Sequence, residues 1–183
     1  MAHGDKDSIF KIGGNLAMVC ILSGLVIAVT YAVTAPVAAE QAINQKAKAM
    51  QELVPEGQKF EPIAGKTDWY SVLKDGKTIA YIVPAEGKGY GGSIKMVAAV
   101  TPEGKAIDFK ILVHNETPGL GDNASKDSFR KQFKGKEAAD LTVVKTPTDK
   151  NIQALTGATI TSKAVTLSIQ KAVEEVKEYS SKK

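Results

Sequence analysis

The stretch WYSVLKDGKTIAYIV, residues 69–83, contains the pattern that decides the fold. Two strand-like runs, Trp69–Leu73 and Ile79–Val83, flank the turn sequence Lys74-Asp75-Gly76-Lys77. Asp-Gly between two runs rich in β-branched and aromatic residues is a strong signal for a β-hairpin. The stretch therefore predicts two antiparallel strands joined by a tight turn.

A second hairpin follows further along the chain. The apolar runs Ile94–Val100 and Ala106–Val113 flank the turn sequence Thr101-Pro102-Glu103-Gly104. Two hairpins in succession favour an antiparallel sheet over alternating strands and helices. Between the hairpins lies the glycine-rich segment Glu86–Gly92, which is either a flexible connection or a loop that contacts a ligand.

Helical patterns flank the predicted sheet on both sides. Before it, Ala38–Leu53 has apolar residues at helical spacing, and Pro55-Glu56-Gly57 ends that helix. After it we expect a short helix at Ser125–Phe133 with Ser125 as N-cap, a strand at Leu141–Lys145 and a loop at Pro147–Ala158. A last amphipathic helix is expected at Ser162–Tyr179. The expected apolar stripes are Ile43, Ala47, Met50 and Leu53 on the first helix, and Val165, Ile169, Val173 and Val176 on the last. The sequence thus predicts an α+β fold, an antiparallel sheet of hairpins with flanking helices.

The segment Ile12–Thr34 is an uncharged run of apolar residues near the N-terminus. As a helix it would reach about 34 Å, enough to cross a bilayer core of about 30 Å. A cleavable signal peptide with a small-residue site at Ala35–Ala39 is the alternative, but the apolar run is longer than signal peptides usually have. Lys6 and Lys11 precede the run, so the positive-inside rule places the N-terminus in the cytoplasm.

These features together predict the domain organisation. We expect a cytoplasmic N-terminus at residues 1–11, one transmembrane helix at 12–34 and a helical connector at 35–57. Residues 58–183 would form one extracytoplasmic domain behind this anchor. The predicted location is the cell membrane, in a single-pass arrangement.

Composition excludes several classes of function. The chain has 24 basic and 20 acidic residues, and its net charge is +4. The basic residues are scattered and do not alternate with aromatic ones, which argues against a nucleic-acid partner. A single cysteine, Cys20, and two distant histidines, His3 and His114, predict neither an internal disulfide nor a metal site. The chain also lacks the G-x-S-x-G and Walker A sequences of hydrolases and P-loop proteins, and no catalytic residue is expected.

The segment Glu116-Thr117-Pro118-Gly119-Leu120-Gly121 follows the last predicted strand of the second hairpin. Its glycines would let the backbone approach a flat ligand closely, and Leu120 could lie against a ring. A tight turn without a ligand is the alternative.

The segment Leu155-Thr156-Gly157-Ala158-Thr159-Ile160-Thr161-Ser162 precedes the last predicted helix. It is hydroxyl-rich, and Thr161 or Ser162 is the expected N-cap. A helix start can also bind phosphate through its free N–H groups and dipole, so a phosphate site is the second interpretation.

Both segments resemble sequences of a known family. Thr156-Gly157-Ala158-Thr159 resembles the [ST]-G-A-[ST] flavinylation motif of FMN-binding-domain proteins, and Glu116–Gly121 resembles their E-T-P-G-L-G loop. Gly89-Tyr90-Gly91-Gly92 before a strand is also similar. With one N-terminal span and this motif order, the chain is similar to the G subunits of Rnf electron-transport complexes. These are related to the C subunit of the sodium-translocating NADH:quinone reductase.

The resemblance implies a cofactor and the residues that hold it. FMN would be bound covalently, through a phosphoester to Thr159. Glu116 and Thr117 would make polar contacts to the flavin, and backbone or packing contacts would come from Gly119, Leu120 and Gly121. The phosphate would be surrounded by Thr156, Gly157 and Ala158. Tyr90 and Trp69 are interpreted as packing residues of the core or rim. Gln153 departs from the family, which usually has an acidic residue six positions before the modified threonine.

The implied function is that of an electron carrier. The protein would be a redox subunit of an Rnf-type ion-translocating ferredoxin:NAD oxidoreductase complex rather than a complete enzyme. Its partners would be the membrane, the other subunits, and a flavin transferase for maturation. Two alternatives stay open: a stand-alone membrane-anchored flavoprotein that donates electrons to an extracytoplasmic reductase, and a flavin-free anchored binding domain.

Overall fold

The computed structural model describes residues 4–182, and it describes side chains from residue 9 onward. His3 and the rest of residues 1–3 lie outside this range. The chain divides into two compact units between Asn44 and Gln45. The second unit therefore includes residues 45–57, which the sequence analysis assigned to a connector.

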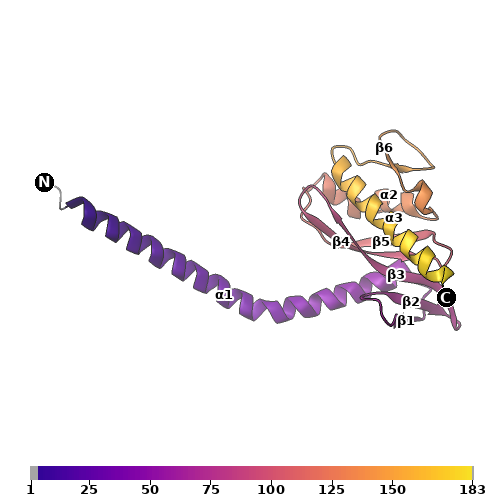
Figure 1. Ribbon diagram of the computed structural model, residues 1–183, viewed down its shortest axis with the longest axis horizontal. Coiled ribbons are helices and arrows are strands. Elements are labelled where there is room, and N and C mark those ends of the chain that lie inside the picture. Colours follow the sequence, from indigo (N-terminus) through magenta and orange to yellow (C-terminus); the bar gives the residue numbers. More distant parts are fainter. Residues whose placement is uncertain (1–3, 183) are drawn as a thin grey trace. The chain divides into compact units, whose positions relative to one another are not determined.

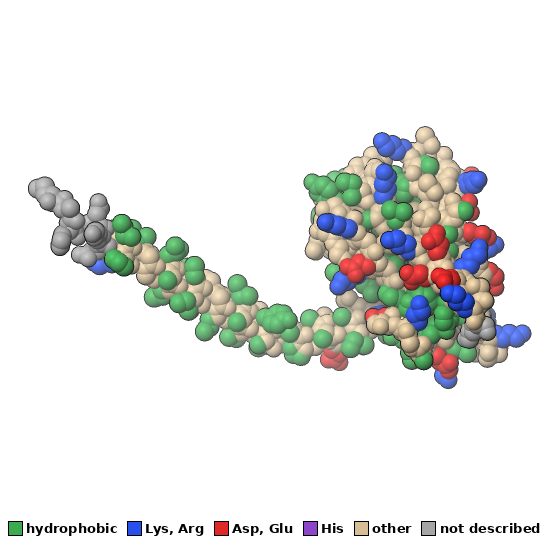
Figure 2. Space-filling view, viewed as in Figure 1, with side chains coloured by type: hydrophobic (Ala, Val, Ile, Leu, Met, Phe, Trp, Pro, Cys, Tyr) green, Lys and Arg blue, Asp and Glu red, His purple; other side chains and the backbone are tan. Residues whose placement is uncertain are grey.

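The first unit is formed by most of helix α1, which runs from Gly4 to Leu53 without interruption (Figure 1). Apolar side chains are exposed along this helix, and Figure 2 shows them along the face that it presents. Its stretch Ile9–Leu53 contains a window with a mean hydropathy of 2.4, so α1 is long and apolar enough to cross a membrane. Pro36 lies inside the helix, so the predicted transmembrane helix and the predicted helical connector belong to one continuous helix. The predicted span boundaries, residues 12 and 34, stay a prediction.

The second unit is built on a five-stranded antiparallel sheet in the order β1-β2-β3-β4-β5. Its strands are β1 (Lys59–Pro62), β2 (Tyr70–Lys74), β3 (Lys77–Lys88), β4 (Ser93–Val100) and β5 (Ala106–Val113). Both predicted hairpins and the predicted α+β class are confirmed. Strand β1 was not expected, because its sequence Lys-Phe-Glu-Pro has little apolar signal of its own.

Strand β3 is longer than predicted, because the glycine-rich segment after it is not a free connection. β3 pairs with β4 as far as Lys88 opposite Ser93, and Gly89 N donates to Gly92 O at 2.8 Å to close the turn. Glu86–Lys88 is therefore strand, and only the following glycines form a turn. This arrangement makes β3 and β4 a third hairpin.

The sheet buries both of its faces. Alternate residues of β3 point to opposite sides: Ala80 and Ile82 belong to one apolar cluster, Tyr81 and Val83 to the other. A sheet covered on both faces needs such near-continuous apolar strands. It therefore forms a rigid base for the loops at its edges.

Helix α3, Thr159–Ser181, covers one face of the sheet and lies mainly over β3 and β4 (Figure 1). Its predicted stripe is confirmed, since Val165, Ile169, Val173 and Val176 are each at most 1% exposed. The helix approaches β3 closely at Gly87, where an added Cβ would lie 2.5 Å from Ser168 Oγ and 2.7 Å from Ala164 O. This contact explains why the strand has a glycine at this position, where a side chain would clash with the helix.

The last turns of α1 cover the other face. Ala49 and Leu53 lie one turn apart and are buried with the cluster that contains Val72 and Ile82. The stripe predicted for this helix is partly wrong, since Ala47 is exposed and Ile43 is 70% exposed. Within this stripe, the residues at the end of the helix are the ones that pack against the sheet.

Short elements connect β5 to α3, and they differ most from the prediction. In place of the expected helix Ser125–Phe133 the structure has three short helices. These are the 3₁₀ helix η1 (Gly121–Ser125), the α-helix α2 (Asp127–Arg130) and the 3₁₀ helix η2 (Lys131–Phe133). Lys126, not Ser125, precedes α2, because Ser125 still belongs to η1. The remaining elements are η3 (Ala138–Asp140), β6 (Val143–Val144) and β7 (Ile152–Gln153). β6 and β7 pair in parallel. The predicted strand Leu141–Lys145 is therefore reduced to the two residues of β6, and the predicted loop Pro147–Ala158 contains β7.

The packing of α3 predicts a large difference between two neighbouring positions on it. Ile169→Ala deletes a side chain that is 1% exposed, and we expect it to lower the free energy of unfolding by about 2–5 kcal/mol. Leu167→Ala removes a side chain that is 53% exposed, and we expect a change within about 0.5 kcal/mol. Urea unfolding of the full chain in detergent measures both. Equal losses at the two positions would contradict the orientation of α3.

Candidate functional site

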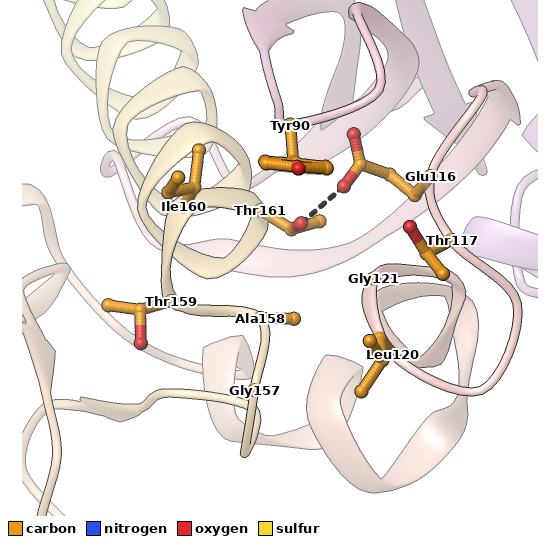
Figure 3. A pocket seen from close by; sticks show the side chains of 10 residues that line it. All are labelled: Tyr90, Glu116, Thr117, Leu120, Gly121, Gly157, Ala158, Thr159, Ile160 and Thr161. Atoms are coloured by element: carbon orange, nitrogen blue, oxygen red, sulfur yellow. Dashed lines mark hydrogen bonds between the residues drawn. The ribbon is translucent and has the colours of Figure 1, made fainter.

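A cavity of about 540 Å³ opens where three segments of the second unit meet. Tyr90 comes from the β3–β4 turn, the second segment follows β5, and the third is the start of α3 (Figure 3). The lining residues are Tyr90, Glu116, Thr117, Leu120, Gly121, Gly157, Ala158, Thr159, Ile160 and Thr161. Segments far apart in the sequence thus form one site.

The cavity brings together most of the residues singled out from the sequence. Seven line it: Glu116, Thr117, Leu120, Gly121, Gly157, Ala158 and Thr159. The other two, Gly119 and Thr156, are not among the lining residues; Gly119 is exposed and Thr156 lies one residue before the lining begins. The hydroxyl-rich segment before α3 and the Glu116–Gly121 loop therefore face the same cavity.

Three lining residues were not predicted. Ile160 and Thr161 follow Thr159 directly, and their place in the hydroxyl-rich segment Leu155–Ser162 was the available signal in the sequence. Tyr90 lies on the rim and is 76% exposed, whereas Trp69 is 5% exposed in the core against Tyr179. An aromatic residue between glycines in a hairpin turn was the available signal for Tyr90.

The loop after β5 is shaped by a turn. Leu120 N donates to Thr117 O at 3.1 Å, and Gly119 has φ +77°. Pro and Gly at the two central positions match a type II turn, which requires a positive φ at its third residue. The turn directs Leu120 toward Gly157, where an added Cβ would lie 3.0 Å from Leu120 Cδ2. Gly119 therefore shapes the site from outside the cavity.

The start of α3 differs from the prediction. The N-cap is Ala158, not Thr161 or Ser162, because the helix begins at Thr159. Ser162 still orders this region, since its Oγ donates to Ala158 O at 2.9 Å and accepts from Leu155 N at 2.9 Å. A hydroxyl expected as a cap thus ties the preceding loop to the first turn from inside the helix.

The same helix start suits an anion. In the described chain, Ala158 offers no side-chain cap, and the first turn of α3 has no acidic residue. The first backbone bond of the helix runs from Ser162 N to Ala158 O at 3.0 Å. The N–H groups of Thr159–Thr161 precede it and need partners from outside the helix. They and the helix dipole favour an anion at this position, beside the Thr159 hydroxyl.

Glu116 connects all three segments of the site. Its carboxylate accepts a hydrogen bond from Gly91 N at 2.9 Å through Oε1. Through Oε2 it accepts a second one from Thr161 Oγ1, which Figure 3 shows as a dashed line. Its own backbone N donates to His114 Nδ1 at 3.2 Å. The residue is only 6% exposed, so these bonds replace the water that a carboxylate would otherwise require.

Two glycines make room for the Glu116 carboxylate, and a third makes room for the backbone beside it. An added Cβ would lie 2.3 Å from Glu116 Oε1 at Gly89, and 2.5 Å from Oε2 at Gly121. At Gly91 it would lie 1.9 Å from Asn115 O. The turn between β3 and β4 can therefore reach the loop after β5 only without side chains at these positions.

The rim of the cavity is apolar and open. Tyr90, Leu120 and Ile160 are 76%, 43% and 55% exposed. Figure 3 shows Thr159 on the side of the cavity away from Glu116 and Thr117. The site thus offers an anion-binding start of a helix at one end and an aromatic and an aliphatic surface beyond it. This combination suits a ligand with a phosphate group and a flat ring.

Comparisons with known proteins agree with this description. Residues 89–174 match the FMN-binding domain family, and residues 1–53 match the RnfG N-terminal region. The chain is 58% identical over 173 residues to the G subunit of the proton-translocating ferredoxin:NAD(+) oxidoreductase complex of Clostridium ljungdahlii, with 94% of each chain covered. The chain belongs to the family of Rnf G subunits.

More distant members have similar lengths. The G subunit of the Na(+)-translocating complex of Acetobacterium woodii is 31% identical, with 93% of this chain and 92% of the relative covered. Among solved structures, the C subunit of the Na(+)-translocating NADH-quinone reductase of Parabacteroides distasonis is 27% identical and has a TM-score of 0.52. That match covers 67% of this chain and 72% of the other. NqrC of Shewanella oneidensis, at 21% identity and a TM-score of 0.53 over 70% and 73% of the two chains, shares the fold. The predicted resemblance is confirmed.

The cavity fits FMN. All its lining residues fall within the matched FMN-binding domain, and its volume lies in the range of small-molecule sites, roughly 300–1,000 Å³. The uncapped helix start suits the phosphate, and Tyr90 and Leu120 offer surface to a ring. This Rnf G subunit thus has both the anion site and the apolar surface that the cofactor needs.

The close packing at Gly91 predicts that Gly91→Ala destabilises the protein because the new Cβ clashes with the facing loop, without any strain from a positive φ. The new Cβ would meet the Asn115 carbonyl, which is backbone and cannot move aside cheaply. Gly76→Ala is the comparison, because Gly76 has φ +75° but open space around it, and we expect it to cost about 1 kcal/mol. Thermal melting of the flavin-free protein should show a larger loss for Gly91→Ala. A smaller loss there would contradict the close approach of the two loops.

Proposed function

We propose that this chain is the FMN-carrying electron-transfer subunit of an Rnf-type, ion-translocating ferredoxin:NAD oxidoreductase complex. The observation that carries the proposal is the convergence of Thr159, the start of α3 and the Glu116–Gly121 loop on one cavity within the FMN-binding domain. Relatives that match nearly the full chain are named as the G subunits of such complexes. The other subunits of the complex are then its partners.

The FMN is held covalently, through a phosphoester to Thr159. Among the hydroxyl side chains of this segment, Thr161 donates to Glu116 and Ser162 donates to Ala158 O, and each is at most 1% exposed. Thr156 lies outside the cavity lining. Thr159 lines the cavity and begins the helix. It therefore combines access with a position beside the phosphate site.

A flavin transferase makes this bond. Thr159 Oγ1 would be the acceptor of the flavin phosphoryl group from an activated flavin donor, and it would give its proton to a base of the transferase as the donor's leaving group departs. The N–H groups at the start of α3 stabilise the phosphate charge. Gly157 has no side chain and leaves the approach to Thr159 open.

The protein's residues position the cofactor and limit its contact with water. Tyr90, Leu120 and Ile160 offer apolar surface, while Glu116 and Thr117 present polar atoms to the cavity. FMN bound here supplies the electron-accepting and electron-donating chemistry. The polypeptide sets its orientation and its electrostatic surroundings.

The protein spans the membrane once through α1, with its N-terminus in the cytoplasm. Lys6 and Lys11 precede the apolar stretch, and the FMN domain then faces the extracytoplasmic side. A reporter enzyme active only outside the cytoplasm, fused after Lys183, should be active. A reporter active only in the cytoplasm should be inactive at the same site, and the reverse pattern would refute the orientation.

The covalent linkage predicts the behaviour of two threonine variants. The full-length protein expressed with a flavin transferase should give a fluorescent band on a denaturing gel, and Thr159→Ala should abolish it because the acceptor oxygen is gone. Thr156→Ala is the matched control, three residues earlier in the same segment, and should keep most of the fluorescence. Fragmentation mass spectrometry of the tryptic peptide Asn151–Lys163 locates the FMN.

Three results would count against the linkage. The first is a Thr159→Ala protein that stays fluorescent after denaturation. The second is a wild-type peptide with the mass of FMN on another hydroxyl. The third is a wild-type protein that binds FMN but releases all of it on denaturation, which would support FMN as the cofactor and refute the phosphoester.

A further inference from the structure

Glu116 is a buried acid at the wall of the cavity, and positioning alone does not account for it. The residue is 6% exposed, although a neutral amide or a hydroxyl could also bridge Gly91 and Thr161. Burial of a carboxylate is unfavourable unless hydrogen bonds replace its water. The fold meets this requirement with Gly89 and Gly121, which leave room around the two oxygens, and with Gly91, which lets its backbone N–H approach the loop after β5.

The hydrogen bonds of Glu116 match the acceptor role of a carboxylate. Oε1 accepts from a backbone N–H and Oε2 accepts from a hydroxyl, so both oxygens act as acceptors. The ion pairs of the described residues lie elsewhere on the surface, and Glu116 takes part in none of them. The cavity wall thus holds a negative charge that is hydrogen-bonded but not neutralised by a cation among the described residues.

This charge lies at the part of the cavity left for the flavin ring. The phosphate belongs at the start of α3, beside Thr159, where the N–H groups are free. The lining beyond that point consists of Tyr90, Glu116, Thr117, Leu120 and Gly121. A flavin with its phosphate at Thr159 therefore extends along Glu116.

We propose that Glu116 is a built-in negative charge that lowers the reduction potential of the FMN. The inference rests on the proposed function, because it needs FMN in this cavity. Electrons added to a flavin are repelled by a nearby carboxylate, and a partly buried site screens that repulsion less than water does. Charge beside the flavin ring is one of the means by which a protein tunes the cofactor.

The test is Glu116→Gln, which keeps the shape and an acceptor for Gly91 N but removes the charge. A redox titration of the flavinylated full-length protein in detergent measures the ratio of reduced to oxidised FMN at a fixed potential. We expect this ratio to rise about tenfold, which for a two-electron couple corresponds to a potential about 30 mV more positive. The reduction potential is a property of each bound flavin, so the titration works even if only a small fraction of the protein carries FMN.

Two further variants separate charge from structure. Thr161→Val removes the donor to Oε2 and keeps the charge, so the ratio should stay at or below the wild-type value. A purely structural role would move the ratio more in Thr161→Val, which breaks the contact between residues 116 and 161, than in Glu116→Gln, whose amide can still bridge Gly91 N and Thr161 Oγ1. Glu86→Gln removes an exposed acid of β3 outside the cavity lining, and solvent screening should limit its effect to less than twofold.

Each outcome has one meaning. A wild-type protein without FMN overturns the proposed function itself. FMN in both proteins with ratios within twofold of each other overturns only the role of Glu116. An equal rise in Glu86→Gln, or a rise in Thr161→Val, also overturns it. A Glu116→Gln protein that takes up no FMN at any transferase concentration overturns it in favour of a role in loading.

Discussion

The site depends on one buried carboxylate that binds three segments at once. Glu116 accepts a hydrogen bond from the β3–β4 turn through Gly91 N and another from the first turn of α3 through Thr161, while its own backbone belongs to the loop after β5. Through this one side chain the turn and the helix are joined across the cavity wall. The glycines around it follow from the same requirement, because each leaves empty the space that a side chain would deny to the carboxylate or to its loop.

This arrangement is possible because the sheet beneath it is covered on both faces. The last turns of α1 pack on one side and α3 packs on the other, so the strands end at fixed positions and the loops start from them. Close approach at Gly87 seats the N-terminal half of α3 against β3. The position of Thr159 is thus set by packing along the whole helix rather than by contacts at its first turn alone.

Local sequence patterns were enough to predict the hairpins of the sheet, the last helix and the two segments that form most of the site. The Asp-Gly turn and the alternating apolar residues specify the hairpins, and the valine and isoleucine spacing specifies the buried face of α3. What could not be predicted depends on tertiary contacts. Nothing local shows that Thr161 is held by an acid 45 positions away, that Gly87 lies in a strand under a helix, or that α2 is a single turn anchored by Phe129 and Phe133. The family resemblance supplied Thr159, where the local pattern alone favoured a capping residue.

The shape of the cavity also explains why a covalent bond suits this carrier. Tyr90, Leu120 and Ile160 stay largely exposed, so the rim can cover only part of a flat ligand. Affinity depends on how much surface a site buries and on how well its polar groups are matched, and an open site gives up part of both. A tether replaces that lost affinity with a high effective concentration of the ligand beside its site. An open rim, in turn, leaves the ring accessible to redox partners, which an enclosing pocket would prevent. On the proposed linkage, therefore, the phosphoester at Thr159 and the exposed rim are two parts of one solution, since the bond retains the cofactor that the exposure would otherwise release.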